Sequence, residues 1–136
     1  MSAAGYAGTP LAGKIGIRAG DRVVLRHRPD DWEVPGFPEG VSLTERASHT
    51  ADVTLTFHRT RRELAREAPG LVERLADRAM LWVAWPRKAA GHDSDITENV
   101  LREVFLPLGV VDVKVAALGE DWSALKFVRR TENRAG

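Results

Sequence analysis

The sequence has no cysteine among its 136 residues, and neither sign of charge dominates. The absence of cysteine excludes a disulfide scaffold, a thiol nucleophile and any zinc site built on thiolates. Lysine and arginine together number 20 against 19 aspartates and glutamates, so the formal net charge is only +1. That balance argues against a broadly basic nucleic-acid binder.

Long apolar runs are also missing. None approaches the roughly 20 residues that a membrane helix requires, and the opening segment MSAAGYAGTP has no apolar signal core. These absences predict a cytoplasmic protein with neither a membrane nor a nucleic-acid partner. The length fits one domain over residues 1–136, in which we expect residues 1–8 and the tail at 131–136 to be flexible.

The apolar pattern predicts a mainly parallel sheet that ends in a hairpin. We expect parallel strands at residues 22–27, 41–46, 52–58 and 80–85, the second of them a short edge strand. The run MLWVAW at 80–85 is apolar throughout, which is typical of a central strand covered on both faces. Alternating residues from 111 to 130, with a Gly-Glu-Asp turn in the middle, predict an antiparallel hairpin.

Three helices are expected around these strands. A proline-started helix should end near residue 15. The pattern Thr60-Arg-Arg-Glu63 is a capping box, so a second helix should begin directly after Thr60, and Pro69 should bend or split it. Asp95, with a glutamate three residues later, is expected to cap a third helix that ends near residues 107–109.

This element order predicts an α/β domain with a truncated Rossmann-like sheet, flanked by helices and closed by a C-terminal antiparallel β-hairpin. Across residues 20–130 it resembles the C-terminal half of class I S-adenosylmethionine methyltransferases, whose last two strands form such a hairpin. The resemblance implies a methyltransferase-like fold. A glycine-rich turn should follow the first strand of a cofactor-binding sheet, but residues 27–31 read His-Arg-Pro-Asp-Asp, so we expect no bound cofactor.

Histidines and basic residues gather where the predicted parallel strands end. The candidate ligand-binding residues are His27, Arg28, His58, Arg59, Trp85, Arg87, Lys88 and His92. The carboxyl ends of parallel strands meet at one edge of a sheet, where ligands usually bind. Arginine forms paired hydrogen bonds with phosphate or carboxylate, and a helix N-terminus near Thr60 or Asp95 would assist. The edge is therefore predicted to hold an anionic ligand.

Other interpretations of this edge stay open. Aspartates lie between the histidines, so a His/Asp metal site or a general acid–base pair would occupy the same place. The spacing His-x-x-x-His is absent, and we assign no metal ligand and no catalytic residue. Loops at strand ends are also polar in proteins that bind nothing there.

The tryptophans and the hairpin lysines have similar alternatives. Trp82 and Trp85 should lie on opposite faces of the central strand, both in the core, with Trp85 as a second candidate for a pocket wall. Trp32 is expected to be partly exposed, as a lid or partner contact. Lys114 and Lys126 fit either a protected sheet edge or a groove for a partner.

Longer segments carry a second resemblance. They are Gly5-Tyr6-x-Gly8-Thr9-Pro10-Leu11, LWVAWPRK at 81–88, DITENVLREVFLPLG at 95–109, and VDVKVAALGEDWSALKFVRRTENR at 111–134. Together they resemble a small bacterial family catalogued as domain of unknown function 3052. That resemblance implies a stand-alone cytoplasmic domain and carries over no catalytic residue.

The leading functional hypothesis is a non-catalytic binding or regulatory domain that holds a small anionic ligand or a partner at the strand ends. One alternative is an enzyme, a divergent group transferase similar to the methyltransferases. Another is an interaction module that docks through the C-terminal hairpin or the segment around Trp32. The sequence leaves the oligomeric state open.

Overall fold

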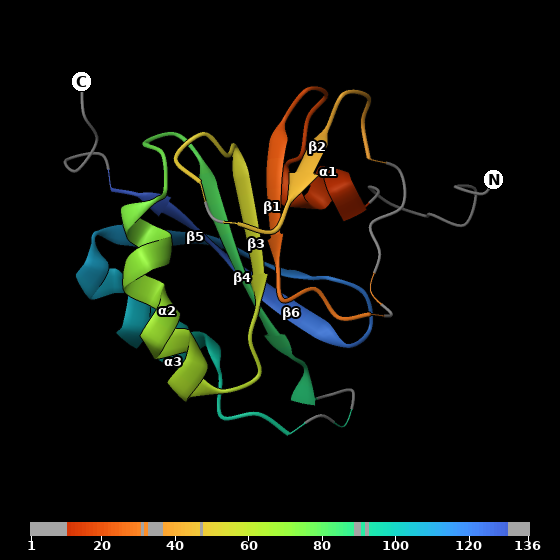
Figure 1. Cartoon of the computed structure of the whole chain (residues 1–136). Coiled ribbons are helices and arrows are strands. Elements are labelled where there is room, and N and C mark those ends of the chain that lie inside the picture. Colours follow the sequence, from red (N-terminus) through yellow and green to blue (C-terminus); the bar gives the residue numbers. More distant parts are fainter. Residues whose placement is uncertain are drawn as a thin grey trace.

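A six-stranded mixed sheet forms the centre of the molecule (Figure 1). The computed structural model describes residues 11–30, 32, 37–46, 48–88, 91 and 93–130. The predictions for the two ends, residues 1–8 and 131–136, therefore lie outside the described residues, as does the proline that was expected to start the first helix.

The helices and strands follow one another in the predicted order. They are α1 (Leu11–Ile15), β1 (Arg22–Arg26), β2 (Ser42–Thr44), β3 (Val53–Phe57), α2 (Arg61–Glu73), β4 (Met80–Pro86), α3 (Glu98–Phe105), the 3-10 turn η3 (Leu106–Leu108), β5 (Val110–Ala117) and β6 (Trp122–Arg129). The sheet order is β2-β1-β3-β4-β6-β5. The first four strands in that order are parallel, and β6 is antiparallel to both neighbours. The predicted α/β fold with a terminal antiparallel hairpin is confirmed.

The order β2-β1-β3-β4 places a topological switch point between β1 and β3. The chain leaves β1 to form β2 on one side and then returns to form β3 on the other side. In open α/β sheets the crevice at the carboxyl ends of the two strands beside such a point is the usual ligand position. His27 and His58 are the first residues after these two strands.

Two apolar layers cover the sheet. On one face, α2 and α3 pack on β4 and β6, with Leu64, Leu101 and Phe105 fully buried (Figure 1). On the other face, Ile15 of α1 packs with residues of β1, β3 and β4. Trp85 belongs to the first layer and Trp82 to the second, as their odd separation predicts. This burial on both faces is why 80–85 is a continuous apolar run.

Trp32 is buried, so the prediction that it is partly exposed is wrong. Its side chain is 7% exposed, and its ring packs edge-on against Phe57 with the centroids 4.8 Å apart. The indole Nε1–H donates a hydrogen bond to the carbonyl oxygen of Leu118, 3.3 Å away. This bond satisfies the polar end of the ring, so the whole side chain can join the core.

Helix α2 runs without a break from Arg61 to Glu73, although Pro69 lies inside it. Pro69 was expected to bend or split the helix, and the expectation of a split is wrong because the helix is continuous. Proline removes one backbone donor, but Leu64, Ala68 and Leu71 anchor the same face of α2 in the core on both sides of Pro69. Packing therefore outweighs the local preference.

The cap of α3 also differs from the prediction. Thr97, not Asp95, is the N-cap, and its hydroxyl accepts a hydrogen bond from the Val100 amide. The Asp95 carboxylate instead accepts a hydrogen bond of 2.7 Å from the Arg61 amide at the start of α2. Two residues of the loop before α3 thus form hydrogen bonds with the N-termini of two helices, Asp95 with that of α2 and Thr97 with that of α3.

Candidate functional site

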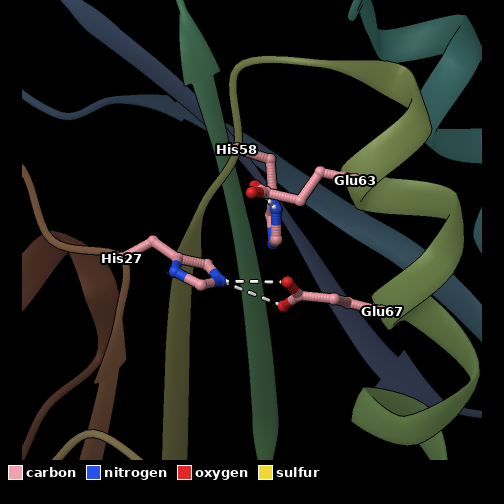
Figure 2. A group of neighbouring side chains, drawn as sticks. All are labelled: His27, His58, Glu63 and Glu67. Carbon is pink, nitrogen blue, oxygen red and sulfur yellow. Dashed lines mark hydrogen bonds and ion pairs between the residues drawn. The ribbon is translucent and has the colours of Figure 1, made fainter.

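Four polar side chains converge at the switch point: His27 after β1, His58 after β3, and Glu63 and Glu67 from α2 (Figure 2). We call them the His–Glu cluster. Each offers one donor atom for a metal, and these four atoms all lie within 4.8 Å of one another. The glutamates are four residues apart on a helix, so they project from the same face.

His58 is held from two sides inside the protein. Its side chain is completely buried, with Nε2 2.7 Å from the Thr56 hydroxyl and Nδ1 2.8 Å from a carboxylate oxygen of Glu63. Burial lowers the pKa of His58 and outweighs the hydrogen bond with Glu63 and the charge of Glu67, which act in the opposite direction. The imidazole is therefore neutral near pH 7, with both ring nitrogens in polar contacts.

His27 and Arg26 share the carboxylate of Glu67. Nε2 of His27 lies 3.0 and 3.1 Å from the two carboxylate oxygens, and Nη1 of Arg26 lies 2.6 Å from one of them. Burial alone would raise the pKa of Glu67, but the hydrogen bonds and charges of His27 and Arg26 hold it below its usual range. Glu67 is therefore ionised at neutral pH.

His27 has a backbone φ of +59°, the only non-glycine residue with a positive φ among the described residues. The left-handed region is strained for residues with a side chain, although histidine is one of the types found there more often. In this conformation the imidazole turns toward Glu67 and meets the His58 ring edge-on, with the centroids 5.3 Å apart (Figure 2). Strain of this kind gathers at functional sites.

A hollow of about 240 Å³ opens the cluster toward solvent. It is lined by His27, Phe57, Arg59, Thr60, Glu63 and Trp122. The His27 side chain is 41% exposed, so a small ion or molecule can reach it. We call this the switch-point hollow.

A larger cavity, of about 470 Å³, lies at the ends of β1 and β2. Four of its lining residues are apolar, namely Leu25, Trp32, Phe37 and Leu43. The other three are polar, namely Arg28, Thr44 and Glu45. Arg28 donates a hydrogen bond to the carbonyl oxygen of Trp32, 3.1 Å away, which holds the guanidinium at the wall. This β1–β2 cavity has the size and the mixed character of small-molecule sites.

An open groove of about 770 Å³ lies at the ends of β3 and β4. Its lining residues are Arg59, Thr60, Lys88, Gly91, Asp93, Ser94 and Asp95. Two cations face two carboxylates, and Asp95 already bonds the first amide of α2. The helix N-terminus that was expected to assist an anion is thus occupied by a carboxylate of the chain itself. We call this the β3–β4 groove.

The predicted ligand-binding residues are divided among these places. His27 and His58 meet in the cluster, Arg28 lines the β1–β2 cavity, and Arg59 and Lys88 line the β3–β4 groove. Trp85 is a core residue that lines none of the three, and Arg87 donates to the carbonyl oxygen of Glu120 in the hairpin turn. His92 lies outside the described residues.

Sequence reasoning missed both glutamates of the cluster. Glu63 was interpreted only as the acidic residue of a capping box, and Glu67 was not considered. The Thr60 hydroxyl does accept a hydrogen bond from the Glu63 amide, but the Glu63 carboxylate bonds His58. The available signal was the four-residue spacing of two acidic residues at the start of a helix that follows a strand ending in histidine.

Comparisons with known proteins give a fold and no family. No family model matches the chain, so the resemblance to domain of unknown function 3052 is not confirmed. No curated protein matches it either. Among the described residues, no helix has the length and apolar character needed to cross a membrane.

Solved structures of similar fold are mainly methyltransferases. One is a SAM-dependent methyltransferase from Aquifex aeolicus, with a TM-score of 0.57 and 11% identity, matched over 86% of each chain. Another is a protein of the NADB-Rossmann superfamily from Streptococcus agalactiae, with a TM-score of 0.56 and 12% identity. The match covers 98% of this chain and 74% of the Streptococcus protein. A third, a Sulfolobus solfataricus protein assigned to the type 11 methyltransferases, has a score of 0.51 and 16% identity. The match covers 71% of this chain and 63% of the Sulfolobus protein. These likenesses confirm the Rossmann-like, methyltransferase-like fold.

Proposed function

We propose that this domain binds a small nucleoside-type ligand, such as S-adenosylmethionine, in the β1–β2 cavity. The observation that carries the proposal is the lining of that cavity. Phe37 offers aromatic surface for a base, the buried Trp32 forms part of the wall, and Glu45 directly follows β2. An acidic residue at this point, about 20 residues after the first strand, binds ribose hydroxyls in dinucleotide-binding sheets.

Arg28 supplies the remaining contact. Its guanidinium stands at the same wall and suits a carboxylate or phosphate on the ligand. The chain has no glycine turn after β1, so backbone amides do not cradle a phosphate as in a dinucleotide-binding sheet. We therefore expect recognition of the base and sugar to contribute more than recognition of phosphate.

The fold supports this proposal without deciding it. The Aquifex aeolicus neighbour is a SAM-dependent methyltransferase, and ligands of such sheets lie at the carboxyl ends of the strands. A divergent group transferase would need this binding step first. The residues of the β1–β2 cavity suit this binding step, and we propose no residue for the transfer step itself.

The test is calorimetric titration of the purified chain with S-adenosylmethionine, adenosine and inorganic phosphate, together with thermal melting. S-adenosylmethionine and adenosine should bind and stabilise the fold. Glu45→Gln or Arg28→Gln should weaken the binding of S-adenosylmethionine by about fivefold or more. Matched controls are Glu39→Gln and Arg46→Gln, because both residues are exposed and neither lines the cavity. Equal affinity in all four variants, or no binding by the wild type, contradicts the proposal.

A second candidate function is anion binding in the β3–β4 groove, where Arg59 and Lys88 stand together. The phosphate arm of the same titration tests it. Phosphate binding that Lys88→Gln abolishes and Arg28→Gln leaves intact would favour the groove. No binding of phosphate would eliminate it.

A further inference from the structure

The His–Glu cluster has the composition of a metal site. Two imidazoles and two carboxylates face one another, a donor set that suits zinc and other divalent first-row transition ions. We propose that Nε2 of His27, Nδ1 of His58 and one carboxylate oxygen each from Glu63 and Glu67 bind such an ion, with Zn²⁺ the best match. This site is separate from the β1–β2 cavity and does not depend on the function proposed for it.

The distances fit the demands of a tetrahedral ion. Bonds of about 2.0–2.2 Å to nitrogen and oxygen place the donors of a tetrahedral zinc site about 3.3–3.6 Å apart. Here the His58–Glu63 and His27–Glu67 donor atoms are 2.8 and 3.0 Å apart, and no pair of the four exceeds 4.8 Å. Binding would open the two close pairs slightly and close the wider ones by about 1 Å, which side-chain torsions can supply.

Neighbouring groups already orient two of the donors. The Thr56 hydroxyl contacts Nε2 of His58 at 2.7 Å, so Nδ1, which lies 2.8 Å from a carboxylate oxygen of Glu63, is the nitrogen left for an ion. A hydroxyl oxygen can accept a hydrogen bond from the Nε2–H group when Nδ1 binds a metal, and histidine ligands are commonly oriented in this way. Arg26 holds the Glu67 carboxylate through a hydrogen bond of 2.6 Å.

Charge also favours a cation at this point. Of the two carboxylates, Glu67 is paired with the Arg26 guanidinium, while the guanidinium of Arg59, which also lines the hollow, stacks over the Trp122 ring, 4.9 Å from its centroid. The His58 side chain contributes no exposed surface, so solvent screens charge less on its side of the cluster than beside His27, whose side chain is 41% exposed. A divalent ion would take the place of the hydrogen bonds that the histidines now donate to the glutamates.

The proposed ion would be structural. Four protein donors complete a tetrahedral shell and leave no open position for a substrate. The ligands come from the ends of β1 and β3 and from the first two turns of α2, so the ion would tie these three elements together. The switch-point hollow, with His27 partly exposed, gives the ion its path of entry.

The test uses the untagged chain after treatment with a chelator. Calorimetric titration with ZnCl₂ should show one equivalent bound with micromolar or tighter affinity, and Co²⁺ should give the visible absorption of a four-coordinate site. His27→Asn and Glu67→Gln should each weaken zinc binding by about tenfold or more. Asparagine tolerates the left-handed backbone at position 27, so the first variant removes the imidazole without adding strain.

Matched controls separate this site from surface binding. His49 is exposed elsewhere, and Glu73 is exposed at the end of α2, so His49→Asn and Glu73→Gln should bind zinc like the wild type. Glu45→Gln should leave zinc binding unchanged, so failure of the nucleoside proposal would not affect this result.

Two outcomes would overturn the proposal. One is a wild-type chain that binds no zinc at millimolar concentration, which would make the cluster a hydrogen-bonded network only. The other is equal zinc affinity in His27→Asn, Glu67→Gln and the two controls. Circular dichroism of each metal-free variant shows that it is folded before it is titrated.

Discussion

The Thr56 hydroxyl lies 2.7 Å from Nε2 of His58, and both side chains are buried at the end of β3. This contact joins a strand interior to the His–Glu cluster. It also explains how an imidazole can be completely buried, since Glu63 satisfies its other nitrogen.

Thr56→Val should therefore destabilise the fold. Valine keeps the shape but leaves a buried ring nitrogen of His58 without a partner, which costs about 1–3 kcal/mol of unfolding free energy. Urea denaturation at pH 7 measures this loss. Thr54→Val is the matched control, because Thr54 is buried two residues earlier in β3 and is not a hydrogen-bond partner of His58. A loss no larger than that of the control would show that the hydroxyl contributes little.

Much of the fold follows from local patterns. The continuous apolar run at 80–85, the capping box at Thr60 and the alternation on both sides of the Gly119 turn each predict their element correctly. These signals are strong because burial on two faces, capping and strand pairing all act over a few residues.

The errors come from contacts between distant residues. Nothing near Trp32 shows that its indole will reach the backbone of Leu118, 86 positions away. Nothing near Asp95 shows that it will serve the helix starting at Arg61. The candidate site has the same character: His27 and His58 could be placed at one sheet edge, but Glu67 joins them only because α2 packs back over that edge.

Pro69→Ala should stabilise the protein. Proline has no amide to donate to the carbonyl oxygen of Ala65, and its ring crowds that turn, so alanine should add about 1–3 kcal/mol to the unfolding free energy. Thermal melting should show a rise of several degrees. The control is Pro38→Ala, because Pro38 lies outside the helices and strands of the described residues, so no helical hydrogen bond is missing there. An equal change in melting temperature in both variants would show that Pro69 does not destabilise the interior of α2.

Lys114→Glu should also stabilise the fold, through the hairpin. Lys114 is directly opposite Lys126 across β5 and β6. Partial burial lowers the pKa of Lys126, and the charge of Lys114 lowers it further. Replacing the like-charged partner with an acid should add about 0.2–1 kcal/mol at pH 7.

The pH dependence of this gain has a definite sign. Below the folded-state pKa of Lys126 the ammonium is charged in the folded and unfolded chains, so the native state carries the full repulsion. As the pH rises through that lowered pKa, native Lys126 loses its proton first, and the repulsion fades. The advantage of Lys114→Glu, measured by urea denaturation, should therefore shrink between neutral and alkaline pH. In a Lys126→Gln background the advantage should be absent at every pH, and its persistence there would assign it to another contact.

Asp95→Ala should destabilise the start of α2 rather than α3. The Asp95 carboxylate accepts the 2.7 Å hydrogen bond from the Arg61 amide and places a negative charge at the positive end of the α2 dipole. Its removal should cost about 1 kcal/mol of unfolding free energy, a part of which added salt should reduce. Asp93→Ala, which removes an exposed aspartate in the same loop, should change stability by less than about 0.5 kcal/mol.

Hydrogen exchange of the Asp95→Ala variant locates the effect. We expect faster exchange of the first amides of α2 and unchanged exchange of those of α3, because Thr97 caps α3 independently. Faster exchange in α3 alone would instead restore Asp95 as the cap of that helix.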